Sequence, residues 1–123
     1  MNQLHITLEE NSPAIKWTNT QADRIGARGH VGTHLDCYTT VPEKPEYNIT
    51  AMVLDCQNEM PKEEDIKSLT TLENMALLLH TANLERNEYG TDMYFSTETF
   101  LSEEVLHTIL EKKPLLLSSI LMV

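Results

Sequence analysis

The sequence predicts an α/β domain with a mixed β-sheet. Three mainly apolar runs of strand length lie at residues 49–56, 75–79 and 115–122, and the segments that begin at Pro61 and Ser102 carry helix-start signals between them. Strands that alternate with helices are typical of α/β units. Further extended segments are expected before residue 49, and this order of elements favours a mixed sheet.

The N-terminal part of the chain is expected to be mainly extended. Residues 4–8 alternate apolar and polar side chains, which is the period of a half-buried strand. A second short strand is expected at residues 15–17, after the turn-prone residues 11–13, and residues 22–28 are expected to be extended. Residues 41–47 contain two prolines and three charges, so a loop is expected there.

The second half of the chain is expected to supply two helices. The first begins at Pro61, because proline suits the first helical turn and the acidic residues 63–65 complement the helix dipole there. The second begins at Ser102 and extends to Lys113. The polar residues 83–94 between the helices are expected to run over the surface. The apolar strand 49–56 is expected at a buried position of the sheet.

Composition narrows the classes of function and partner. The 123 residues include 19 acidic and 9 basic side chains, and the net charge of −10 argues against nucleic acid and anionic membranes as partners. No run reaches the roughly 18–20 apolar residues of a membrane-spanning helix, and residues 1–10 lack the pattern of a signal peptide. We therefore expect a cytoplasmic protein of one domain, residues 1–123, in which Cys37 and Cys56 are free thiols.

A cluster of histidine, aspartate and glycine lies at residues 29–36. His30, His34 and Asp36 share parity, so an extended chain would direct all three side chains to one face. Four residues of straight strand span about 13 Å, however, which is too far for two ligands of one ion. If both histidines bind one ion, the chain must therefore bend between them, and Gly32, which lies midway, permits that bend.

Two imidazoles and a carboxylate form a ligand set that suits zinc first, with manganese, iron or nickel as alternatives. Three protein ligands leave a position for a water molecule, whose pKa a cation lowers toward neutrality. Two histidines four residues apart also occur without any metal. The pattern alone therefore leaves open both a metal site and a coincidental arrangement.

The same residues carry a family resemblance. His30-Val31-Gly32-Thr33-His34-Leu35-Asp36 resembles the H-x-G-T-H-x-D signature of the cyclase family of metal-dependent hydrolases, which includes bacterial kynurenine formamidases. Residues 51–55, 63–69, 75–82 and 101–113 resemble the strands and helices that follow the motif in that family. Together these segments extend the resemblance over most of the chain.

The resemblance implies a domain of the swivelling β/β/α type that hydrolyses an amide, formamide or lactam-like C–N bond. It implies that His30, His34 and Asp36 bind a divalent cation, zinc first and manganese as the alternative. It also implies a small-molecule substrate and a homo-oligomer, either a dimer or a tetramer.

The chain departs from the family pattern at several positions. Tyr38 and Thr40 stand where the family has proline and histidine, and that histidine is the expected proton-transfer residue. Threonine is no base near neutral pH, so the catalytic residues are left unassigned. The family also supplies later histidine and glutamate ligands, whereas no histidine follows His107. We therefore expect the C-terminal part of the family domain to be absent, either by truncation or because a partner chain completes a short member.

Two further residues are candidates for substrate binding. Trp17 is one, because the resemblance places aromatic residues near the N-terminus, and core packing is its alternative role. His80 is the other, because active-site side chains often lie where the strands of α/β folds end, and a structural hydrogen bond is its alternative. Cys37 has the opposite parity to the metal face, and Cys56 is expected to be a small buried residue.

The sequence thus leaves three interpretations of function. The first is a metal-dependent hydrolase that uses metal-activated water. The second is a non-catalytic or truncated relative that acts as a metal-binding or structural subunit. The third is a plain α/β module in which the motif arose by chance.

Overall fold

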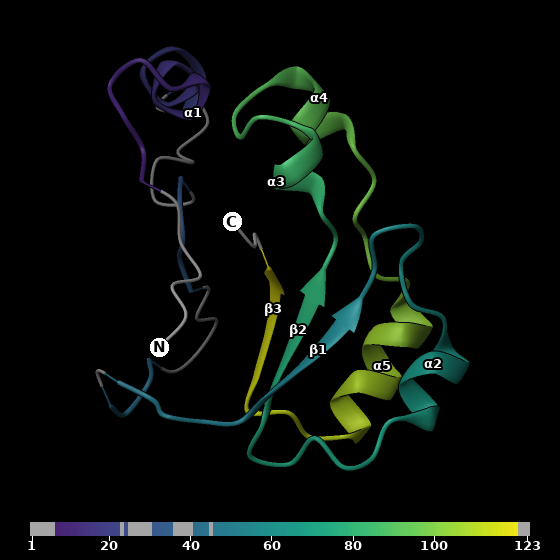
Figure 1. Cartoon of the computed structure of the whole chain (residues 1–123). Coiled ribbons are helices and arrows are strands. Elements are labelled where there is room, and N and C mark those ends of the chain that lie inside the picture. The colour runs from purple at the N-terminus through teal and green to yellow at the C-terminus, as the bar shows by residue number, and fades with distance from the viewer. Residues whose placement is uncertain (1–6, 23, 25–30, 36–40, 45, 121–123) are drawn as a thin grey trace.

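The computed structural model describes residues 7–22, 24, 31–35, 41–44 and 46–120 (Figure 1). In chain order, its elements are α1 (Pro13–Trp17), a π-helical turn η1 (Thr18–Ala22), β1 (Ala51–Asp55), α2 (Glu63–Ser68), β2 (Ala76–His80), α3 (Asn83–Arg86), α4 (Asp92–Ser96), α5 (Glu103–Glu111) and β3 (Leu116–Ile120). The strands predicted at residues 49–56, 75–79 and 115–122 are confirmed as β1, β2 and β3. The helices predicted after Pro61 and Ser102 are confirmed as α2 and α5.

The described strands form one three-stranded sheet in the order β1–β2–β3. Both pairs of neighbours are parallel, and Asp55, His80 and Ile120 are aligned at the carboxyl end of the sheet. The α/β class is therefore confirmed. The antiparallel strand that a mixed sheet requires does not occur among the described residues, and residues 4–6 of the predicted first strand lie outside them.

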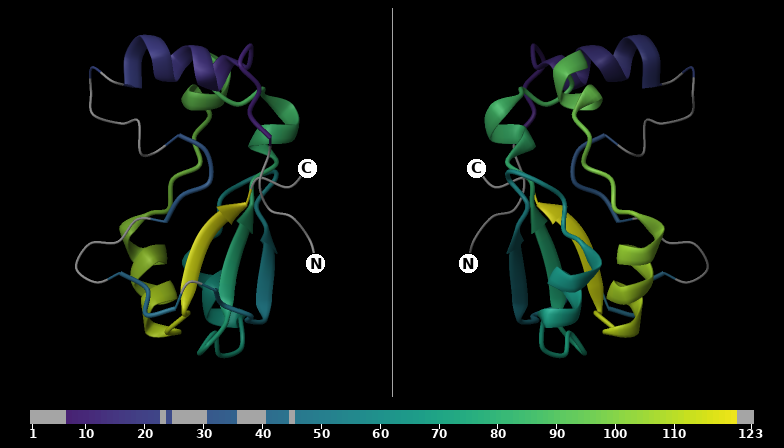
Figure 2. Two further views of the ribbon diagram at one scale, coloured as in Figure 1. Left: turned by 90° about the vertical axis from the view of Figure 1, so that its left-hand side faces the viewer. Right: turned by 90° about the vertical axis from the view of Figure 1, so that its right-hand side faces the viewer.

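A hydrophobic core joins one face of the sheet to α2 and α5. Figures 1 and 2 show these two helices on the same side of the strands. The buried members of this core are Cys56, Ile66, Leu72, Leu77, Leu79, Val105 and Ile109. On the opposite face of β2, Ala76 and Leu78 are also buried, which explains the continuous apolar run of the central strand. The prediction that residues 49–56 occupy a buried position is wrong, because β1 lies at the edge of the described sheet and Val53 is 51% exposed.

The strand predicted at residues 15–17 is wrong, because this segment belongs to the helix α1. Ser12 caps the helix, since its Oγ accepts a hydrogen bond from the backbone N–H of Ile15 at 3.4 Å. Pro13 then occupies the first turn, where its fixed φ is already helical. Two large apolar residues favour a strand only weakly, and these local signals outweigh them.

The helices of the second half begin close to their predicted starts. The predicted start of α5 is confirmed, because the Oγ of Ser102 accepts from the N–H of Val105 at 3.3 Å. The helix α2 begins at Glu63, after Pro61, and the Asp65 carboxylate accepts from the N–H of Lys62 at 2.8 Å. Within the described ranges, no helix has the length and apolar character needed to cross a bilayer.

The polar segment 83–94 is not the plain surface excursion that the sequence predicts. It contains α3 and leads into α4, and Asn83 is buried. Gly90 has a φ of +92°, and a Cβ built on it would lie 2.3 Å from the backbone nitrogen of Ala14 in α1. Figures 1 and 2 show α1 beside α4, beyond the carboxyl ends of the strands. Close backbone contact therefore joins the segment to the N-terminal helix.

Candidate functional site

The carboxyl end of the parallel sheet carries a histidine–glutamate pair. His80 ends the central strand, and its Nε2 lies 2.9 Å from the Oε1 of Glu85 in α3. Ala82, with a φ of +53°, reverses the chain between the strand and α3, so Glu85 folds back onto His80. The His80 side chain is only 13% exposed. Ligands of α/β folds bind at this edge of the sheet, so the pair is well placed to contact a substrate.

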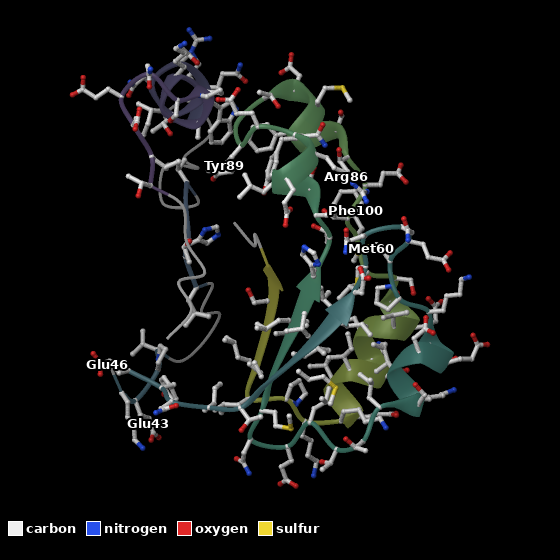
Figure 3. All side chains as sticks on the ribbon, viewed as in Figure 1. Glu43, Glu46, Met60, Arg86, Tyr89 and Phe100 are labelled. Carbon is white, nitrogen blue, oxygen red and sulfur yellow. The ribbon has the colours of Figure 1, made fainter. Side chains whose placement is uncertain are left out.

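The loop after β1 is fastened to the same region. The Asp55 carboxylate accepts from the N–H of Gln57 at 3.0 Å, and Arg86 donates to the Gln57 carbonyl at 2.6 Å. Figure 3 shows Arg86 and Tyr89 on opposite sides of α3 in the view drawn. Arg86 therefore holds the helix α3 to the loop after β1.

The electrostatic environment of Glu85 favours its ionised form. Burial by itself raises the pKa of this carboxyl group. The hydrogen bond and charge of His80, the hydrogen bond from its own backbone and the charge of Arg86 outweigh burial, so the pKa of Glu85 lies below its ordinary 4.5. The pair is therefore built to hold a carboxylate against the imidazole of His80.

We expect Glu85→Gln to remove a pH-dependent contribution to stability. A carboxyl group with a lowered folded-state pKa stabilises the protein above its unfolded pKa, and this contribution is lost as the pH falls through the folded-state pKa. Because Glu85 is partly exposed, the effect at neutral pH is discounted to about 0.5 kcal/mol. Urea titrations from neutral pH to about pH 3 measure it.

The matched control for this prediction is Glu88→Gln, because Glu88 is an exposed glutamate of the same segment. The difference from the parent should shrink on acidification for Glu85→Gln only. An equal response of the two variants would contradict the role given to the His80–Glu85 pair.

The structure describes residues 31–35 of the predicted metal motif. Gly32 has a φ of +84°, which confirms the bend predicted between the two histidines. The Nδ1 of His34 lies 2.8 Å from the carbonyl oxygen of Gly32, and His34 is exposed. His30 and Asp36 lie outside the described residues, so the assembly of the three ligands stays a prediction. Within the described part of the chain, no group of three histidine, cysteine or acidic side chains is placed to hold a metal ion.

The ring orientation of His34 suits a metal ligand. A carbonyl oxygen can only accept, so Nδ1 is the protonated nitrogen in this hydrogen bond, and in the neutral ring Nε2 carries the lone pair. Histidine ligands of metal ions commonly donate their second N–H to a backbone carbonyl in this way. The described member of the motif therefore fits the proposed donor set.

The turn at Gly32 contacts a residue that the sequence analysis missed. The Gly32 N–H donates to the hydroxyl oxygen of Tyr89 at 2.8 Å, across 57 positions of the chain. Tyr89 packs edge-on against Tyr94, which packs edge-on against Phe95, and Phe95 contacts Trp17, with ring centroids 5.0, 5.5 and 5.2 Å apart. We call Trp17, Tyr89, Tyr94 and Phe95 the aromatic cluster. The signal in the sequence was the close spacing of three aromatic residues, Tyr89, Tyr94 and Phe95.

The two predicted substrate-binding residues lie in different surroundings. Trp17 is half-buried in the aromatic cluster. Its contact with Phe95 supports the alternative role in packing. His80 lies at the end of the sheet, and its hydrogen bond with Glu85 supports the alternative structural role. Contact of either residue with a substrate stays a prediction.

The described cysteine has no place in this site. Cys56 is 5% exposed and belongs to the hydrophobic core, as predicted. Burial, followed by the charges of Asp55 and Asp65, raises the pKa of its thiol, which keeps it protonated and unreactive. Cys37 lies outside the described residues.

Comparison with known proteins identifies the family. Residues 3–119 match the family described as Putative cyclase, and the matched range includes the motif, both core helices and all of the sheet except Ile120. A search of curated proteins and a search of solved structures each returned no match. Because the match covers nearly the whole chain, the protein belongs to the Putative cyclase family.

Proposed function

We propose that this protein is a metal-dependent hydrolase that cleaves an amide, formamide or lactam-like C–N bond. Membership of the cyclase family supports this proposal at the level of the family. One observation on this chain supports it in particular. The carbonyl oxygen of Gly32 accepts the Nδ1–H of His34, a hydrogen bond that metal-binding histidines commonly make. In this proposal His30, His34 and Asp36 hold the ion, with zinc first and manganese as the alternative.

The described residues suggest how the chain's own groups would serve such a reaction. A bound cation would supply an activated water for attack on the substrate carbonyl. His80 would hydrogen-bond the substrate from the end of the central strand, while Glu85 holds its imidazole in place. Trp17 would offer an aromatic surface to the substrate from the aromatic cluster. We further propose a cytoplasmic homo-oligomer, dimer or tetramer, that acts on a small molecule.

Metal analysis tests the proposed site. We expect protein purified without chelator to carry zinc or manganese, and His34→Ala to bind the added metal at least about tenfold more weakly. His107→Ala is the matched control, because the His107 side chain is 72% exposed on α5. Equal metal content of the parent and His34→Ala would contradict the proposal.

A second candidate function rests on the residues at two motif positions. Tyr38 and Thr40 replace the proline and histidine that the family resemblance implies, which favours a non-catalytic metal-binding or structural subunit. Hydrolysis of formyl-aryl amides with added zinc or manganese separates the two candidates. Turnover that Asp36→Asn abolishes would exclude the non-catalytic subunit, and absence of turnover in a metal-loaded parent would favour it.

A further inference from the structure

We infer that Tyr89 is a positioning residue of the metal-binding turn, an inference that rests on the proposed function. Its hydroxyl oxygen accepts the Gly32 N–H at 2.8 Å, although the two residues are 57 positions apart. Figure 3 shows Tyr89 near α1, at the end of the molecule where α3 and α4 lie. A single polar contact therefore joins the motif to a distant part of the fold.

The ring of Tyr89 is held by its neighbours. It meets the ring of Tyr94 edge-on, with the ring centroids 5.0 Å apart and an interplanar angle of 75°. Tyr94 in turn meets Phe95 edge-on at 5.5 Å, and Phe95 contacts Trp17. Edge-to-face contacts between aromatic rings are attractive in this range of separation. The hydroxyl group is therefore presented by a packed cluster and not by a lone surface side chain.

The backbone that carries the aromatic cluster is also fixed by hydrogen bonds. The Asn83 side chain donates to the carbonyl of Tyr94 at 3.1 Å. The Asn87 amide donates to the Asn83 side-chain oxygen at 2.9 Å and to the Thr97 hydroxyl at 3.2 Å. These amides fasten the segment from α3 to the end of α4 into one unit. Tyr89 therefore lies on a platform that hydrogen bonds within the segment hold together.

The two backbone groups of Gly32 connect this platform to the proposed ligand. The N–H of Gly32 donates to Tyr89, and its carbonyl accepts from the Nδ1 of His34 at 2.8 Å. A shift of the turn would move the carbonyl that orients the imidazole. Outer hydrogen-bond partners of a metal ligand commonly change metal affinity when they are removed. Tyr89 is thus expected to act on the cation through Gly32 and His34, without touching it.

The test compares Tyr89→Phe with Tyr94→Phe. The first variant removes the hydroxyl that accepts from Gly32 and keeps the ring, and the second removes a hydroxyl from the same aromatic cluster while leaving that contact in place. Hydrogen exchange of peptides covering residues 31–35 is measured in the metal-free full chain, and zinc affinity is measured by competition with a chromogenic chelator. Circular dichroism checks that both variants are folded.

We expect Tyr89→Phe to speed exchange of the motif peptide roughly fivefold, as the loss of one hydrogen bond predicts. We expect it to weaken zinc binding about tenfold, with Tyr94→Phe close to the parent in both measurements. Equal exchange in the two variants would overturn the inference, as would unchanged zinc affinity of Tyr89→Phe. A parent that binds neither zinc nor manganese would overturn the proposed function, whereas the exchange measurement would still decide whether Tyr89 holds the turn.

Discussion

Replacement of Gly90 by alanine is expected to lower the free energy of unfolding by about 3 kcal/mol. Gly90 has a φ of +92°, where an L side chain is strained. A Cβ at this position would also lie 2.3 Å from the nitrogen and 2.4 Å from the Cα of Ala14, both of which are backbone atoms. Backbone cannot rotate away as a flexible side chain can, so α1 would have to move off the segment that carries the aromatic cluster. Urea denaturation followed by circular dichroism measures the loss.

The structure offers Gly32→Ala as a matched control for this prediction. Gly32 also has a positive φ, of +84°, but among the described residues a Cβ there would meet only the Cδ1 of Leu8, at an ordinary contact distance of 3.8 Å. Its replacement should therefore cost only the backbone strain, about 1 kcal/mol. Equal losses for the two variants would show that the close approach of Gly90 to α1 contributes nothing. The intrinsic fluorescence of Trp17 should change in Gly90→Ala, because the contact between Trp17 and Phe95 depends on α1.

Leu77→Ala is expected to destabilise the protein by a similar amount, about 3 kcal/mol. Leu77 is fully buried on the central strand β2, where it packs in the core between the sheet and the helices α2 and α5. The substitution removes buried methyl and methylene groups, so their contribution to the hydrophobic effect is lost. It also leaves a cavity in closely packed surroundings. The midpoint of urea denaturation should fall in proportion, with an unchanged dependence on denaturant concentration.

The control for Leu77 is the same substitution at an exposed position. Leu110 lies on α5 and is 59% exposed, so Leu110→Ala should change the free energy of unfolding by about 0.5 kcal/mol or less. Alanine is also the better helix former, which offsets part of any lost contact. A loss at Leu110 as large as that at Leu77 would contradict the assignment of the core to the inner face of this helix.

The three strands and the helices α2 and α5 could be predicted because their signals are local. The apolar run of β2 and the cap at Ser102 act over a few neighbouring residues, and the structure confirms both predictions. The strand predicted at residues 15–17 is wrong because other local signals are stronger than its apolar pattern. These signals are the cap at Ser12 and the preference of Pro13 for the first turn of a helix. The buried position expected for residues 49–56 failed because an apolar run cannot tell an edge strand from a central one.

The bend within the motif was predictable from the sequence, but the surroundings of the motif and of His80 were not. The bend at Gly32 followed from the reach of a strand compared with the length of a metal–ligand bond, and the structure confirms it. The partners of His80 and Gly32 did not follow. Glu85 reaches His80 only because Ala82 adopts a left-handed conformation, and alanine carries no signal for it. Tyr89 reaches Gly32 across a contact that no local pattern encodes.

The sequence by itself determined the α/β class, the strands β1 to β3, the helices α2 and α5, and membership of the cyclase family. These properties depend on apolar periodicity, helix capping and ligand type, all of which are written in short stretches of chain. Only the tertiary structure decided the parallel order of the sheet, the packing of α1 on the segment after α3, and the contact of Tyr89 with the motif turn. These features depend on which distant segments bury one another, and a pairwise contact leaves no period in the sequence.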